Sequence, residues 1–328
     1  MDAAIPRLIR GEIAPRSYVL LISGTMNPPH RSHIRLGLHA ARTLRMGGHG
    51  VSAICYVPVH DNYLHNKVAL NVNMSSDTPF GAVTADTMCF PMAQRCQMLQ
   101  ALLQNEDPAD AAVCHVIDYE HANGSDILEE SPGYWAPKLP GGYLRTVPTT
   151  ALIKHFAAHS PLLKHGARLG IVFGVDNLAG MSTWNRPAEL IAHGDLVLVA
   201  REMAKVEFPK DPTDLLRTIK HFVLDSAVPV SFSGSVLFGE TAGTFEHEDV
   251  SGDAAMYMLP ALEGADEHLS STKIRNAIVG CLDILAEHGY NTPHALTGVF
   301  DRAAHGPDSY RAMGHAAETR GERVNAQR

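Results

Sequence analysis

Residues 18–33 read YVLLISGTMNPPHRSH and combine an apolar run, a loop and a pair of histidines. The run at 18–22 carries no charge, which is typical of a strand buried on both faces of a sheet. The loop is rich in Gly, Pro and Asn, and apolar residues at helical spacing follow it. These residues are Ile34, Leu38 and Ala41. A second apolar run at 51–57 then predicts a β-loop-α-β unit with parallel strands and a right-handed crossover.

The alternation of strands and helices continues along the chain. After the first unit, the apolar patterns predict a helix around 92–103, a strand at 113–119, a helix around 152–156, a strand at 169–173, a short helix at 187–192 and a strand at 196–200. This order is typical of a Rossmann-like, doubly wound parallel sheet with helices on both faces, the α/β class.

Two stretches interrupt this rhythm. Residues 71–88 are small and polar without periodicity, and we interpret them as an inserted surface loop. Residues 202–268 mix short β-like runs with loops rich in Gly, Asp and Glu, which predicts sheet-edge strands and a second insertion. The expected organisation is one domain at 17–302, with poorly ordered tails at 1–16 and 308–328.

Composition limits the classes of function. The 328 residues are 45% hydrophobic and carry a formal net charge of −8, so no overall positive field is present to hold nucleic acid. No apolar run reaches about 18 residues, and we therefore expect no transmembrane helix. The five cysteines form no Cys-x-x-Cys pair, which favours free thiols in a reducing compartment, cytoplasmic or nuclear. Most of the 19 histidines are scattered singly, which does not favour a zinc cluster.

The first candidate site is the loop and helix start at 24–33. A ligand binds at the carboxyl end of a parallel strand, and a helix N-terminus offers N–H groups to phosphate. Gly24 would let the backbone approach the ligand closely. His30 and His33 are one helical turn apart, so both imidazoles can point at one spot and bind a phosphate chain. A metal pair and two surface histidines are the alternative interpretations.

A second candidate is the segment 268–275, HLSSTKIR, which precedes a helical pattern. Hydroxyl groups would cap the helix, while its amides, Lys273 and Arg275 would attract an anion. An ordinary capped, basic helix would have the same pattern.

A third candidate is Asp176, which follows Gly174 at the end of a predicted strand and could accept hydrogen bonds from ribose hydroxyls. Trp184, in the polar loop beyond it, could stack on a flat ring or simply anchor the loop.

Taken together, these segments resemble the nicotinamide/nicotinate mononucleotide adenylyltransferase family of the HxGH-containing nucleotidyltransferase superfamily. GTMNPPHRSH at 24–33 resembles the family's first loop, and PVHDNYLHNK at 58–67 is similar to its P-V-x-D-x-Y-x-K segment. FGVDNLAGMSTW at 173–184 and LSSTKIR at 269–275 resemble its G-A-D…W and I-S-S-T-K-I-R segments. The segment 290–300 resembles the family's closing segment.

The chain departs from the family's pattern at several positions. Met26 stands where the family usually has Phe, and Arg-Ser replaces the usual x-Gly between the two histidines. Lys67 lies about one residue beyond the family's usual Lys. Tyr119, in the segment that resembles the mononucleotide-facing one, replaces a stacking Trp. Thr146 and Thr149 are similar to a T-x-x-T segment near the pyridine.

The resemblance implies a role for each matched residue. Catalytic contacts to the ATP phosphates would come from His30, His33, Lys273 and Arg275. Further ATP contacts would come from Gly24, Thr25, Met26, Gly174, Asp176, Ser271 and Thr272. The mononucleotide would be bound by Asn27, Lys67, Tyr119, Thr146 and Trp184. The family uses Mg²⁺, which is expected to reach the site on the substrate phosphates, and its members are commonly oligomeric, so a homo-oligomer is expected.

The residue types suit the implied reaction. The 5′-phosphate of the mononucleotide attacks the α-phosphorus of ATP in line, and pyrophosphate leaves. Because that phosphate is mostly deprotonated at neutral pH, the protein needs only to position the phosphates and neutralise charge. A related adenylyl- or cytidylyltransferase with another phosphate substrate, such as phosphopantetheine, is the alternative within enzymes. Outside enzymes, the alternatives are a nucleotide-binding regulatory protein without turnover and a histidine-based metal-binding module.

Overall fold

The computed structural model describes the greater part of the chain between residues 15 and 274. The described residues are 15–71, 77–78, 81–82, 89–131, 146–163, 166–177, 181, 184, 186, 189–200, 232–238, 241–247, 253–259, 261–262, 271 and 274. The predicted tail at 308–328 lies outside the described residues, and so do residues 1–14 of the predicted tail at 1–16.

The centre of the molecule is an eight-stranded sheet in the order β5-β2-β1-β6-β7-β10-β8-β9. Its strands are β1 (Ser17–Gly24), β2 (Gly50–Pro58), β5 (Cys114–Val116), β6 (Arg168–Gly174), β7 (Asp195–Val199), β8 (Phe232–Phe238), β9 (Thr241–His247) and β10 (Asp253–Leu259). Neighbouring strands are parallel except for the antiparallel pair β8 and β9. The predicted doubly wound parallel sheet is therefore confirmed. The second interrupted stretch supplies β8, β9 and β10; β9 lies at the edge of the sheet as expected, whereas β8 and β10 lie inside it.

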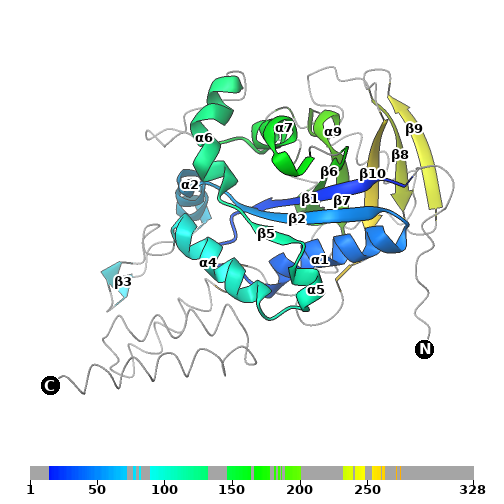
Figure 1. Ribbon diagram of the computed structural model, residues 1–328. Helices are drawn as coiled ribbons and strands as arrows, with labels where there is room; N and C mark the ends of the chain where they lie inside the picture. The colour runs from blue at the N-terminus through cyan, green and yellow to red at the C-terminus, as the bar shows by residue number, and fades with distance from the viewer. Residues whose placement is uncertain are drawn as a thin grey trace.

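Helices cover both faces of this sheet (Figure 1). On one face lie α1 (Arg31–Met46), α4 (Met92–Leu103) and α5 (Pro108–Ala111), and on the other lie α6 (Tyr119–Glu130), α7 (Thr149–His159) and α9 (Glu189–His193). Helix α2 (Asp61–Asn71) follows β2 directly. Within the described residues, none of these helices combines the length and the apolar character needed to cross a bilayer.

Strand β1 shows why an unbroken apolar run is needed at the centre. Val19 and Leu21 point into the core beneath α6 and α7, whereas Tyr18, Leu20 and Ile22 point into the core beneath α1 and α4. These five side chains are at most 2% exposed. Because successive side chains of a strand alternate between the two faces, both sets must be apolar, as the sequence predicted.

A charged network ties strands together at the amino edge of the sheet. Asp195, which is 0% exposed, accepts hydrogen bonds from Tyr18 (2.6 Å), Arg16 (2.8 Å) and Arg168 (2.9 Å). The hydroxyl of Tyr18 also lies 2.8 Å from that of Tyr257 on β10. This network uses the strand starts of β1, β6 and β7, so the opposite edge is the one where the predicted site residues lie.

Three local predictions differ from the structure. The strand predicted at 113–119 is confined to Cys114–Val116, and Tyr119 begins helix α6 instead. Helix α2 was not predicted from the periodicity. In the predicted surface loop, a short antiparallel pair, β3 (Asp77–Thr78) and β4 (Gly81–Ala82), is present.

Candidate active site

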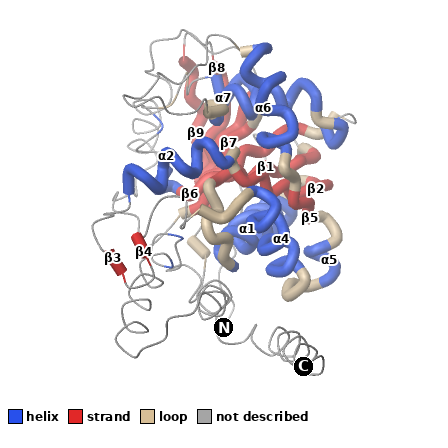
Figure 2. The backbone as a smooth tube through the Cα atoms, turned by 90° about the vertical axis from the view of Figure 1, so that its left-hand side faces the viewer, coloured by secondary structure: helices blue, strands red, loops and turns tan. Residues whose placement is uncertain are grey.

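The candidate site lies where the parallel strands end. Because β1, β2, β5 and β6 run in the same direction, the segments that follow them meet at one edge of the sheet. Figure 2 looks toward this edge, with α1 and α4 on one side of the sheet and α6 and α7 on the other. A backbone hydrogen bond from Val59 N to Gly24 O (2.9 Å) joins the loops after β2 and β1.

His30 and His33 lie together at the start of helix α1. Their ring centroids are 3.7 Å apart with an interplanar angle of 37°, and His30 is only 2% exposed. The His30 backbone N–H donates to Nδ1 of His33 (3.1 Å), and the His33 N–H donates to the His30 carbonyl (2.9 Å). Because Nδ1 of His33 accepts a hydrogen bond, Nε2 carries the proton in the neutral ring. His33 thus has an N–H donor at a helix N-terminus, where anions are favoured.

The loop between β1 and α1 turns two of its predicted ligand residues inward. Met26 is 1% exposed and packs in the core beneath α1, with a φ of 44°. Asn27 is 0% exposed, and its Oδ1 accepts a hydrogen bond from Phe90 N (2.8 Å). These residues shape the loop, and Met26 can offer a ligand only its backbone. Among the described residues beyond its chain neighbours, a Cβ on Gly24 would meet only the Met26 side chain, at 3.9 Å.

Arg95 of helix α4 holds the loops after β1 and β2 in place. Its guanidinium is buried and donates to the carbonyl oxygens of Thr25 (2.8 Å) and Val59 (2.7 Å). It also forms an ion pair with Asp61 (2.6 Å), the first residue of α2, and Nε donates to Phe90 O (2.9 Å). The sequence reasoning missed Arg95, although a usable signal was present. Arg95 lies three residues after Met92 and four before Leu99, on the apolar face of the helix.

The second predicted motif reaches the first loop. The hydroxyl of Ser271 donates to the carbonyl of Pro28 at 3.0 Å, across a sequence separation of 243 residues. Ile274 is 3% exposed and anchors the same segment. Two motifs that were recognised independently therefore lie side by side. Thr272, Lys273 and Arg275 lie outside the described residues.

A pocket of about 310 Å³ opens beside the segment after β2. Its lining includes His60, Asn62, His121, Gly124 and Val147. His60 and His121 are stacked, with ring centroids 4.9 Å apart and an interplanar angle of 17°. The pocket thus joins the segments that the resemblance assigned to the mononucleotide, from three separate parts of the chain. The histidines that line it were not predicted as site residues, although His60 stands within the quoted 58–67 segment.

Glu120 lies behind this pocket and is 1% exposed. Its Oε1 accepts a hydrogen bond from the His60 backbone N–H at 2.9 Å. Burial raises the pKa of the Glu120 carboxyl to about 8, and this outweighs the opposing effects of that hydrogen bond and of the Arg95 charge. Burial also lowers the pKa of His60, and His121 lowers it further. At neutral pH, His60 in the pocket lining is therefore uncharged, and the carboxyl of Glu120 behind it is mostly protonated.

Tyr119 and its neighbours contact α7. The Tyr119 hydroxyl lies 2.9 Å from Nδ1 of His155, and the ring packs edge-on against Phe156 with centroids 4.8 Å apart. Thr146 is half-buried and precedes Val147 of the pocket lining. Lys67 is exposed, near the end of α2.

The predicted ribose site follows β6. Gly174 ends this strand, and Asp176 is exposed in the 3₁₀ turn Val175–Asn177. Asn177 Nδ2 donates to Gly174 O at 3.1 Å and closes this turn. Trp184 is half-buried and packs edge-on against Phe173, with centroids 5.3 Å apart and an interplanar angle of 74°. The contact with Phe173 thus holds the Trp184 ring against the hydrophobic core.

Comparison with known proteins yields structural matches only. No family model matches the sequence, and no curated protein matches it. Two solved structures of a Plasmodium falciparum nicotinic acid mononucleotide adenylyltransferase are similar to this chain. The one in complex with APC has 10% identity and a TM-score of 0.43, and the match covers 80% of this chain and 83% of that chain. The one in complex with NaAD has 11% identity and a TM-score of 0.46, and the match covers 87% and 95%.

Proposed function

We propose that this chain is a mononucleotide adenylyltransferase, which transfers AMP from ATP to nicotinamide or nicotinate mononucleotide and releases pyrophosphate. The observation that carries the proposal is the hydrogen bond between Ser271 and Pro28. It joins two segments, each suited by its residue types to bind phosphate, beside the closely spaced rings of His30 and His33. Their meeting at the carboxyl edge of a doubly wound sheet supports one phosphate-binding site built from both.

In the proposed reaction, a 5′-phosphate oxygen of the mononucleotide attacks the α-phosphorus of ATP. The bond from that phosphorus to the bridging oxygen breaks, and the electron pair leaves with pyrophosphate. His33 Nε2–H and the first amides of α1 would donate to the phosphate oxygens on which charge develops. Lys273 and Arg275 follow Ser271 in the sequence and would supply the positive charge that the leaving group requires.

Magnesium would reach this site on the phosphates of ATP. Among the described residues, one group of three side chains could hold a metal ion by itself, and it comprises Glu130, His155 and His159 at the far end of α6. Asp176 is the exposed carboxylate that follows β6 at the site edge. This donor set fits an ion bound mainly by substrate and water, which is how Mg²⁺ usually binds in phosphoryl-transfer sites. The ion would neutralise phosphate charge.

The mononucleotide would occupy the pocket beside the loop after β2. Its volume of about 310 Å³ is at the lower end of the range for small-molecule sites. His60 and His121 offer ring faces and hydrogen-bonding nitrogens there, and Trp184 would stack on the pyridine from the β6 side. Because burial lowers the pKa of His60, we propose that it acts as a neutral hydrogen-bonding group.

The test is pyrophosphate release from ATP and Mg²⁺ with three acceptors in parallel. These are nicotinamide mononucleotide, its acid analogue and phosphopantetheine. Release with a pyridine mononucleotide, with dinucleotide formed in equal amount, is the expected result. Release with phosphopantetheine alone would reassign the substrate, and no release with any acceptor would favour a nucleotide-binding protein without turnover.

A variant pair tests the role of the histidine pair in the same assay. His33→Ala is expected to lower kcat by about 10² or more, the scale of losing one preorganised donor to a transition-state charge. The matched control is His115→Ala, an exposed histidine on β5. A near-normal kcat for His33→Ala would exclude the assigned role.

A further inference from the structure

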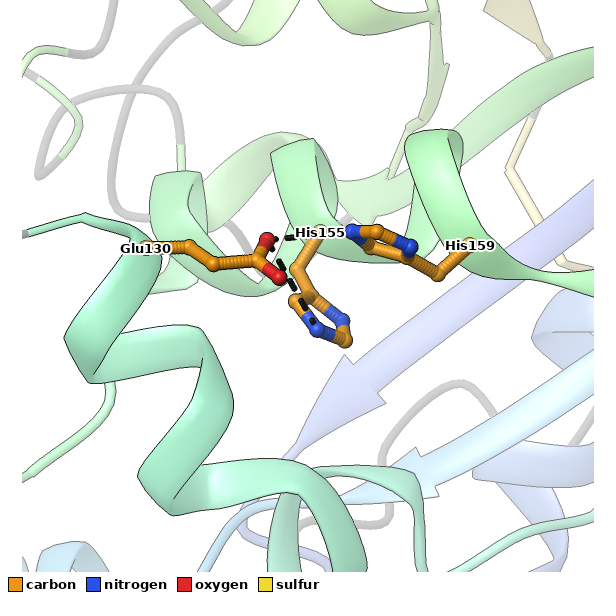
Figure 3. Close-up of side chains that lie close together, drawn as sticks. All are labelled: Glu130, His155 and His159. Carbon is orange, nitrogen blue, oxygen red and sulfur yellow. Dashed lines mark hydrogen bonds and ion pairs between the residues drawn. The ribbon is translucent and has the colours of Figure 1, made fainter.

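Three metal-ligand side chains meet between the ends of α6 and α7, outside the proposed nucleotide site (Figure 3). Glu130 is the last residue of α6, while His155 and His159 lie one turn apart on α7. Oε2 of Glu130 lies 3.0 Å from Nε2 of His159 and 3.9 Å from Nε2 of His155. All three potential ligand atoms lie within 4.8 Å of one another.

These separations are close to those of a tetrahedral zinc site. Zinc bonds of about 2.0–2.1 Å place neighbouring ligand atoms about 3.3 Å apart. The separations of Glu130 from the two histidines, 3.0 and 3.9 Å, lie on either side of that value, so small rotations of the half-exposed Glu130 and His159 would bring the ligand atoms closer to this geometry. Two histidines and one carboxylate are a common three-ligand set for zinc, and water occupies the fourth position in such sites.

The buried member of the cluster is already oriented. His155 has 8% side-chain exposure, and its Nδ1 lies 2.9 Å from the Tyr119 hydroxyl. When Nδ1 donates to the tyrosine oxygen, Nε2 is the unprotonated nitrogen and faces Glu130. An outer hydrogen bond of this kind fixes the tautomer of metal-bound histidines.

Glu130 and His159 are each 50% exposed, so an ion can enter directly from solvent. The cluster also joins separate elements, because Tyr119 and Glu130 lie at opposite ends of α6 and both reach His155 on α7. An ion held here would fix the end of α6 to α7 and the orientation of the imidazole beside Tyr119.

We propose that Glu130, His155 and His159 bind one Zn²⁺ ion, with Tyr119 as the residue that positions His155. With three protein ligands and one open position, this site would differ from structural zinc sites, which have four protein ligands. The proposal does not rest on the proposed adenylyl transfer. Nitrogen ligands favour Zn²⁺ over Mg²⁺, which prefers oxygen ligands in octahedral geometry. Millimolar Mg²⁺ is therefore not expected to displace the ion.

The experiment is calorimetric titration of the full chain with ZnCl₂, after removal of any affinity tag and of bound metal with a chelator, in buffer containing excess MgCl₂. The expected result is one Zn²⁺ ion bound per chain, with higher affinity than any other zinc binding by the chain. Glu130→Gln and His159→Ala should each weaken that site by at least about 10-fold, and Tyr119→Phe by about 10-fold, the scale of losing an outer-shell partner. Circular dichroism of each variant checks that it is folded, and Glu130→Gln changes only an exposed end group.

Two further variants separate this cluster from other histidines. His115→Ala, on an exposed position of β5, should retain the site. His33→Ala should also retain it, although the His30 and His33 rings lie together. Absence of a stoichiometric site in the unaltered chain would overturn the proposal. Equal zinc affinity in the unaltered chain and in His159→Ala would overturn it as well, as would loss of the site in His33→Ala alone.

Discussion

Replacing the carboxyl of Glu120 by an amide should change how the stability of the fold depends on pH. Glu120 is almost fully buried, and burial raises the pKa of its carboxyl from the ordinary 4.5 to about 8. Between these two values the folded chain keeps a proton that the unfolded chain releases. Linkage then requires the free energy of unfolding to fall as pH rises through this window.

The size of the effect follows from the two pKa values. Each pH unit within the window costs about 1.4 kcal/mol, and incomplete titration near pH 5 and near pH 8 reduces the total. We therefore expect this single carboxyl to remove about 3 kcal/mol of stability between pH 5 and pH 8. Glu120→Gln keeps an oxygen that can accept the hydrogen bond from His60 N, but it has no proton to lose.

The assay is urea unfolding of both proteins at pH 5, 6, 7 and 8. Relative to the unaltered chain, Glu120→Gln should gain about 3 kcal/mol between pH 5 and pH 8. Glu129→Gln, at an exposed position on the same helix, is the matched control and should follow the unaltered chain. Parallel curves for Glu120→Gln and the unaltered chain would refute the reasoning. A relative loss at pH 8 would show that the folded structure prefers the carboxylate.

Three other substitutions test separate parts of the structure. Arg95→Met removes the donor of three carbonyl oxygens and the ion pair with Asp61, which keeps its hydrogen bond from Met92 N. It should cost about 3–5 kcal/mol in urea unfolding, and a loss under about 1 kcal/mol would contradict this. Gly37→Ala places a Cβ 2.6 Å from the Tyr56 hydroxyl and should cost about 1–3 kcal/mol, seen as a lower Tm; an unchanged Tm would mean that the helix shifts freely. Trp184→Ala should raise KM for the mononucleotide more than KM for ATP, and equal changes would remove Trp184 from the pyridine site.

The sheet could be predicted from the sequence because its signal is local. Each central strand is a short apolar run, and β1 must be apolar on both faces. The pairing of His30 and His33 was predictable for the same reason, since one helical turn separates them. Helix α2 was missed because it lies beside the sheet edge and shows no strong apolar stripe.

The pocket and the loop contacts could not be predicted, because they depend on residues far apart in the sequence. Arg95 reaches Thr25 across 70 residues, and His60 meets His121 only after α6 has packed on the sheet. A buried arginine on an apolar helix face is a signal that something polar must meet it, but the sequence does not say which groups do so. Tyr119 shows the same limit, since only the packing of α6 on α7 places its hydroxyl beside His155.

The bond between Ser271 and Pro28 has a consequence for the order in which the protein matures. During synthesis the ribosome releases the amino-terminal strands first, and a nascent chain of about 200 residues already contains β1, β2, β5, β6 and β7. The strands of such a chain can already pair with one another. Ser271, which bonds to Pro28 across a sequence separation of 243 residues, has not yet been made. Strands β5, β2, β1, β6 and β7 can thus assemble on the ribosome before Ser271 reaches the first loop, and nucleotide binding at the proposed site would require synthesis to have passed that residue.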